Sequence, residues 1–171
     1  MEESISDFSS LDFSSFNRVG DEERFEFVWN DYLLAKTTRV VVLVEEEYGF
    51  VTYVNEPVKD GFISLYGMDY EFLGKVPVKK IVELREMSTD LIYYRRGGQA
   101  FKLYKFLKGK KFDDEVEIKV EEGGIISGWM GDSIEGGVVL PFIFRSGDSV
   151  IVSLEEIISI SRGDELIWLR N

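Results

Sequence analysis

Apolar residues along this chain occur mostly in short runs that turn residues separate. Val40–Val44, Phe50–Val54 and Phe62–Tyr66 are such runs, with Gly49 and Gly61 directly before the second and third. Short β-branched and aromatic runs bounded by glycine or aspartate are typical of strands joined by tight turns. The same pattern predicts strands at 76–78, 81–84, 91–94, 116–120, 125–129, 138–144, 150–154, 157–160 and 166–169.

Two segments have helical periodicity instead. From Asp21, which can cap a helix, to about Lys36, one apolar stripe runs along the segment. It comprises Phe25, Val28, Trp29, Tyr32 and Leu33. A second helix is predicted from Ala100 to Lys108. Its apolar arc would hold Leu103, Tyr104, Phe106 and Leu107, and its other arc Lys102, Lys105 and Lys108, with Phe101 among the lysines.

The two halves of the chain repeat one pattern. Glu46–Leu65 matches Glu121–Leu140 at a shift of 75 positions, with both glycine pairs aligned. With one inserted residue, Ile81–Leu84 meets Ile157–Ile160. Shared spacing over such a length indicates a duplication. Each copy is expected to be a helix followed by five strands.

The repeated unit resembles the Sm/LSm family of small SH3-like barrels. Lys108–Lys111 leads into a strand, Gly123 and Gly128 lie five apart like the glycines of the family's first motif, and Val152–Ile160 has the apolar spacing of its second. The resemblance implies a mainly β protein with two tandem five-stranded Sm/SH3-like barrels, each preceded by a short helix. Its parts would be a tail (residues 1–20), a first barrel (21–96) and a second barrel (97–171).

The family's RNA-contacting residues are missing from both copies. No D-x-x-x-N-like pattern follows the second strand, and the Arg-Gly of the second motif falls at Pro77-Val78 and Ser153-Leu154. Those residues offer no guanidinium to RNA. A partial likeness to PilZ domains, in Asp132–Gly137 after an Arg-Arg pair, would imply a nucleotide sensor. There Ala100 stands where that family's second arginine belongs.

Composition narrows the chemistry. The chain has 171 residues, no Cys, no His and a formal net charge of -12. Disulfides, thiolate nucleophiles, Cys/His zinc sites and histidine bases are therefore excluded. Adjacent carboxylates at strand ends are typical of solvated faces. We expect a non-enzymatic protein with no catalytic residues, no cofactor and no metal. No apolar run is long enough to cross a membrane and no signal-peptide core is present, so we expect a cytoplasmic protein with no membrane partner.

Residues 95–111 are the most basic part of the chain. They hold seven Lys or Arg and no acid, namely Arg95, Arg96, Lys102, Lys105, Lys108, Lys110 and Lys111. One interpretation is a linker packed between the two copies. The other is a cationic surface for RNA phosphates or an acidic peptide.

Two further candidate surfaces stand out. Tyr53, Asn55, Trp129 and Met130 follow or end the second strands of the copies, where aromatic residues close a barrel or line a peptide groove. The tail repeats an acidic-aromatic unit, Asp7–Leu11 and then Asp12–Phe16. One interpretation is a poorly ordered tail, and the other is a peptide whose apolar residues dock on a hydrophobic or basic surface. We therefore expect an interaction or assembly module that binds a protein partner or itself. The alternative is an RNA-binding protein that uses segment 95–111.

Overall fold

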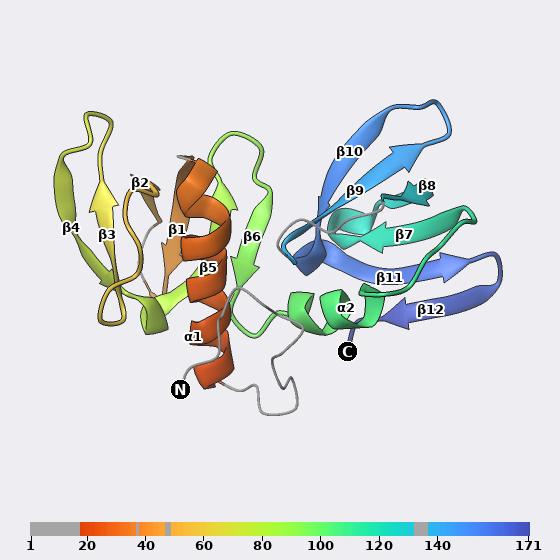
Figure 1. Cartoon of the computed structure of the whole chain (residues 1–171), viewed down its shortest axis with the longest axis horizontal. Coiled ribbons are helices and arrows are strands. Elements are labelled where there is room, and N and C mark those ends of the chain that lie inside the picture. Colours follow the sequence, from red (N-terminus) through yellow and green to blue (C-terminus); the bar gives the residue numbers. More distant parts are fainter. Residues whose placement is uncertain (1–17, 37, 47–48, 132–136) are drawn as a thin grey trace. The chain divides into compact units, whose positions relative to one another are not determined.

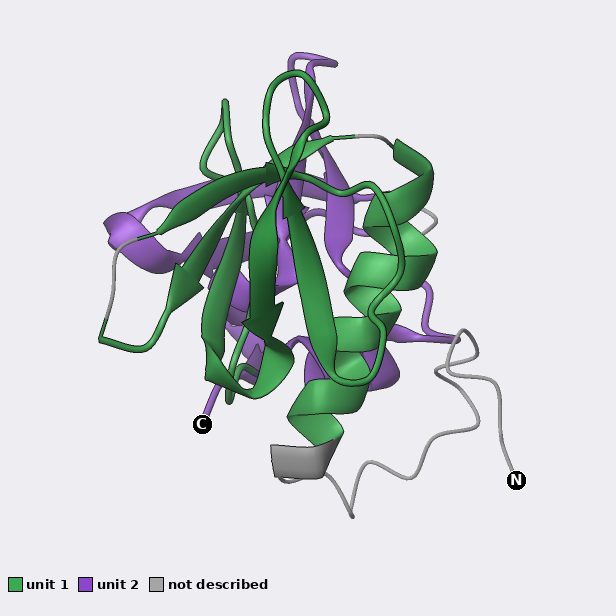
Figure 2. Cartoon of the chain, turned by 90° about the vertical axis from the view of Figure 1, so that its left-hand side faces the viewer, with its two compact units in different colours: residues 1–98 green, residues 99–171 purple. Residues whose placement is uncertain are grey.

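The computed structural model describes residues 18–36, 38–46, 49–131 and 137–171. The predicted tail up to residue 17, and residues 132–136 of the PilZ-like motif, lie outside this part. The chain divides into two compact units, residues 1–98 and 99–171 (Figure 2). With 45% of residues in strands and 24% in helices, the protein is mainly β.

Unit 1 begins with one continuous helical segment. The α-helix α1 (Arg18–Glu26) passes into the π-helix η3 (Phe27–Leu33) and ends in the 3-10 turn η4 (Leu34–Lys36). The predicted apolar stripe is confirmed at four of its five positions, because Phe25, Val28, Trp29 and Leu33 are buried, whereas Tyr32 is half-buried. The prediction that Asp21 caps the helix is wrong, since the helix already begins at Arg18. The Asp21 carboxylate lies instead 3.4 Å from the Arg24 guanidinium, one turn further along.

The strands of unit 1 form two sheets (Figure 1). The larger has the order β2-β1-β5-β6, and β3 pairs with β4 in a separate hairpin. The backbone amide of Tyr66 donates to the Thr52 hydroxyl at 2.7 Å and so connects β3 to β2. The bounds are β1 (Arg39–Val44), β2 (Phe50–Tyr53), β3 (Phe62–Tyr66), β4 (Phe72–Pro77), the 3-10 turn η5 (Val78–Lys80), β5 (Ile81–Glu86) and β6 (Ile92–Arg95).

Unit 2 begins with α2 (Ala100–Leu107), as the sequence predicts, and continues with one antiparallel sheet. The strand order is β10-β9-β8-β7-β11-β12, so β10 and β12 are the edges (Figure 1). The bounds are β7 (Val116–Val120), the 3-10 turn η6 (Glu121–Gly123), β8 (Ile125–Met130), β9 (Val139–Phe144), β10 (Ser149–Ser153), the 3-10 turn η7 (Leu154–Glu156), β11 (Ile157–Arg162) and β12 (Glu165–Leu169).

The two units share one strand order. In each, the fifth strand returns to pair with the first after a 3-10 turn, as β5 does with β1 and β11 with β7. The ladder of unit 1 differs only in its interruption between β2 and β3. The expectation of five strands per copy is wrong, because the described residues of each unit already form six. The sixth strand forms a hairpin with the fifth, across turns in which Asp90 and Gly163 have positive φ.

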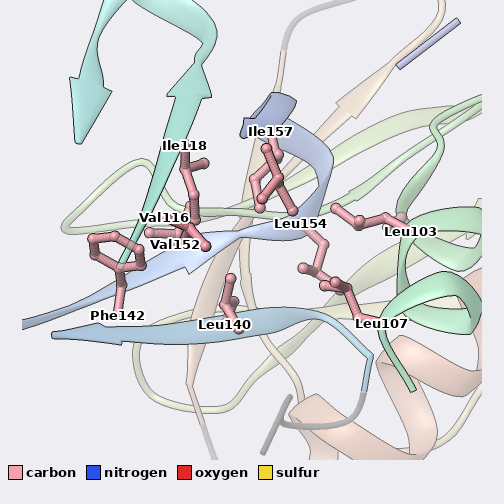
Figure 3. Close-up of a cluster of buried hydrophobic side chains, with 11 residues drawn as sticks. Leu103, Leu107, Val116, Ile118, Leu140, Phe142, Val152, Leu154 and Ile157 are labelled. Atoms are coloured by element: carbon pink, nitrogen blue, oxygen red, sulfur yellow. The ribbon is translucent and has the colours of Figure 1, made fainter. Parts of the chain in front are cut away.

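Each unit has its own apolar core. In unit 1, Trp29 stacks on Phe25 at 5.7 Å between ring centroids, and Tyr94 meets Phe25 edge-on at 5.2 Å. In unit 2, Leu103 and Leu107 of α2 point toward buried side chains of the sheet and of the turn η7 (Figure 3). These are Val116, Ile118, Leu140, Phe142, Val152, Leu154 and Ile157. Burying large aliphatic side chains stabilises such a core by about 1.5–3 kcal/mol each.

Candidate functional site

The two arginines of the basic segment belong to unit 1 and hold its own strands together. The Arg95 guanidinium donates to Glu83 at 2.9 Å. That of Arg96 lies 2.6 Å from Glu45 and donates to the carbonyl of Lys79 at 2.8 Å. Glu83 is buried and also accepts from Arg85 at 2.6 Å. These arginines therefore have structural partners.

The five lysines of the segment belong to unit 2, and all are exposed. They lie on α2 and on the loop after it, whereas Ala100, Leu103 and Leu107 of the helix are buried. The prediction that Phe101 lies on the exposed arc with the lysines is wrong, because this ring is only 3% exposed.

Two of these lysines lie over aromatic rings. The Lys110 ammonium is 4.7 Å from the ring centroid of Phe106, and that of Lys108 is 5.9 Å from the ring of Tyr104. A cation at this distance is attracted by the negative face of the ring. The rings thus hold two positive charges close to the surface of unit 2.

A cavity of about 540 Å³ opens beside this loop. Leu107 and Leu140 line it with apolar atoms, and Lys110 and Lys111 line it with charge. Met130, a candidate from the other set, lines the same cavity. The structure therefore brings together residues from the basic segment and from the second-strand loop, which the sequence treats as separate surfaces.

The remaining loop candidates lie elsewhere. In unit 1, Tyr53 stacks on Tyr70 with ring centroids 4.6 Å apart, and the Arg39 guanidinium lies 5.7 Å from the Tyr53 ring. Tyr70 and Asn55 are exposed. The half-exposed ring of Tyr53 is thus already covered in part by unit 1 itself.

Trp129 lies on an apolar outer face of the sheet in unit 2. Trp129 stands directly opposite Ile143 on β9. Pro141 precedes Ile143 by two residues on the same strand, and it stands opposite Ile151 on β10. Side chains two apart along a strand share a face, so these four residues form one surface. Ile151 is 51% exposed and Ile143 is 41% exposed. We call Trp129, Pro141, Ile143 and Ile151 the outer face.

The outer face ends at strand β10, which is an unusual sheet edge. Most edge strands carry a charge, a proline or a bulge that blocks pairing with a further strand. Among the described edge strands, the ladders at β4, β6 and β12 have such a bulge, and those strands also carry Lys75, Pro77, Arg95 and Glu165. Strand β2 has neither a charge nor a bulge, but β3 lies beside it, where the Tyr66 amide donates to the Thr52 hydroxyl. Strand β10 reads Ser-Val-Ile-Val-Ser, pairs with β9 without a bulge and carries no charge.

Sequence reasoning missed β10 as a candidate surface. A signal was present, because a β-branched run without a charge or a proline is a strand without a built-in block to pairing. The sequence alone does not predict that this strand lies at an edge of the sheet. That depends on β11 crossing to β7 and leaving β10 with one neighbour.

Within the described residues, no cluster of three or more acidic side chains is arranged to hold a metal ion. No helix of the described part is long and apolar enough to cross a membrane. Compared with models of protein families, with curated proteins and with solved structures, the chain has no match.

Proposed function

We propose that this protein is a non-enzymatic assembly module built from two Sm-like units, and that it self-associates through the free edge of β10. The Sm-like interpretation is supported by the order of elements in each unit. A helix precedes a run of successive antiparallel strands, and a 3-10 turn leads to a strand that returns to the first.

The observation that carries the proposal is the unprotected edge of β10. Its outward backbone N–H and C=O groups have no strand partner among the described residues. Its Val150 and Ile151 side chains are 39% and 51% exposed. A strand of a second copy could pair with these groups, and its apolar side chains could cover the outer face next to the edge. Such pairing would bury both the polar and the apolar groups.

Sedimentation of the full chain at micromolar concentration tests this proposal. The wild-type chain is expected to sediment as a dimer or a larger assembly. Ile151→Lys places a charge on the edge strand and should give a monomer. Ile125→Lys is the matched control, because Ile125 is 63% exposed but lies on β8, which has strands on both sides. A wild-type monomer, or equal dissociation by both variants, would contradict the proposal.

RNA binding is the second candidate function, and the exposed lysines of α2 favour it. Lys102 and Lys105 lie on α2, which also carries the half-buried Tyr104, and Lys108 follows the helix directly. Phosphate contacts by lysine weaken steeply with salt. Binding of fluorescent oligouridine at about 50 mM salt, lost on reversal of these three charges to glutamate, would support this function. The net charge of -12 opposes it, and absence of binding at that salt concentration would exclude it.

A further inference from the structure

The cavity of unit 2 is a continuation of its core. Its lining residues Leu107 and Leu140 are 5% and 1% exposed and belong to the buried cluster of this unit. Phe112 and Met130 also line the cavity and pack against that cluster while remaining partly exposed. An apolar side chain entering here would therefore extend a core that already exists. The thioether of Met130 can adapt to the shape of such a side chain.

The rim of the cavity is positively charged. Lys110 and Lys111 line it, and Asp113 is the single acidic residue among the lining side chains. Neither lysine forms an ion pair with a described residue, and both are exposed. A cavity that combines apolar side chains with two lysines favours a ligand that presents an apolar side chain next to a carboxylate.

Nucleic acid fits this cavity less well. Unstacked bases are usually bound on exposed aromatic faces along a basic groove. Here the lining offers one aromatic ring, that of Phe112, and the protein carries a net charge of -12 that repels a phosphate chain. A short acidic peptide carries fewer charges and can present an apolar side chain to Leu107, Met130 and Leu140.

The chain itself contains a peptide of this chemistry. Residues 1–17 hold four acidic residues and no Lys or Arg. Within them the unit Asp-Phe-Ser-Ser-Leu at 7–11 recurs as Asp-Phe-Ser-Ser-Phe at 12–16. Each unit places a phenyl ring directly after a carboxylate, so one phenyl ring could enter the cavity while its carboxylate meets a lysine of the rim.

We propose that residues 7–16 of this chain bind in the cavity of unit 2. A phenyl ring from either five-residue unit packs against Met130 and Leu140, and the preceding aspartate pairs with Lys110 or Lys111. The surface is separate from the β10 edge, so this proposal does not depend on self-association through that edge.

Methionine methyl resonances of the full chain provide a direct test. The four methionines are Met1, Met68, Met87 and Met130, so few signals need assignment. A ring packed on the Met130 methyl shifts its resonance through the ring current. The combined change Phe8→Ser, Leu11→Ser, Phe13→Ser and Phe16→Ser should move that resonance. Met68 and Met87, which are 74% and 42% exposed on unit 1, should not move.

A peptide with the sequence of residues 5–17 tests the same contact in trans. Added to the full-length serine variant, it should return the Met130 resonance to its wild-type position in a saturable and salt-sensitive way. Lys110→Glu with Lys111→Glu, in the serine variant, should abolish this effect. Lys79→Glu with Lys80→Glu is the matched control, since these adjacent lysines are exposed on unit 1 and the charge change is equal.

Three results would overturn the proposal. The first is a Met130 resonance that stays in place when the four apolar residues become serine. The second is a peptide effect that survives reversal of Lys110 and Lys111. The third is an oligouridine probe that shifts Met130 in a manner dependent on the same lysines while the peptide does not, which would assign the cavity to nucleic acid.

Discussion

Gly128 on β8 lies so close to Ile143 on β9 that a methyl group on its α-carbon would come within 2.1 Å of the Ile143 carbonyl oxygen. The same methyl would be 2.9 Å from the ring of Phe142. Gly128 also stands opposite Val116 on β7 and Phe144 on β9. The sheet of unit 2 therefore depends on the absence of a side chain at this position.

Gly128→Ala is expected to destabilise unit 2. The alanine methyl would have to displace backbone atoms of β9, and overpacking of this kind typically costs about 1–3 kcal/mol. Gly124→Ala is the control, because a methyl there meets only a Val120 methyl at 3.4 Å, an ordinary contact. Urea denaturation followed by tryptophan fluorescence should show a lower midpoint for Gly128→Ala alone. Equal urea midpoints for the two variants would show that β9 can move away from the new methyl group without loss of stability.

Local pattern predicts most of the strands in this protein. The predicted run Phe62–Tyr66 has the same bounds as β3, and Val116–Val120 the same as β7. Both are apolar runs limited by turn chemistry, which is a property of neighbouring residues. The 3-10 turn η7 was not predicted, since the apolar run at 150–154 continues into it and gives no sign of the bend.

The candidate surfaces depend on contacts that local pattern does not contain. Met130 and Lys110 line one cavity although they are far apart in the sequence. From the sequence, the charge of Arg96 predicts a nucleic-acid surface. In the fold its guanidinium already pairs with Glu45 at 2.6 Å. Charge and periodicity identify residues that can bind, whereas the fold decides which of them already have partners.

Tyr66→Phe is expected to raise the pKa of Glu56. The Ser64 side chain and the Tyr66 hydroxyl, which donates to the Glu56 carboxylate at 2.8 Å, both hold the pKa of Glu56 below its usual value. A lowered pKa in the folded state stabilises the fold above the unfolded pKa, and this contribution is lost as pH falls through the folded pKa. Carboxyl NMR titration should show the rise in Tyr66→Phe and none in Tyr70→Phe. An unchanged Glu56 pKa would assign the effect to Ser64.

Tyr93→Phe is expected to reduce the loss of stability at alkaline pH. Burial, and secondarily the negative charge of Glu86, raise the pKa of Tyr93 to about 12. An unfolded tyrosine titrates near about 10, so the unfolded state loses its proton first. Neutral Tyr93 therefore contributes fully to the free energy of unfolding below the pKa of the unfolded state, and this contribution is lost as pH rises through the folded pKa. Chemical denaturation of the wild type and of Tyr93→Phe, at pH values between the unfolded and the folded pKa, should show a free energy of unfolding that falls less steeply with pH in Tyr93→Phe. Parallel declines would contradict the raised pKa.

Arg24→Leu is expected to loosen the end of unit 1. The Arg24 side chain is 3% exposed, and its guanidinium donates to the carbonyls of Arg95 and Gly98 and lies 5.0 Å from the Tyr94 ring. A hydrogen bond from a charged group contributes about 1.5–3 kcal/mol. Trypsin should therefore cleave after Arg95 faster in Arg24→Leu, and also in Arg24→Lys, because one ammonium does not match the two-carbonyl geometry. Arg162→Leu, which removes a half-exposed arginine from unit 2, should leave that rate unchanged. Equal cleavage rates in all the variants would show that Arg24 does not stabilise the backbone around Arg95.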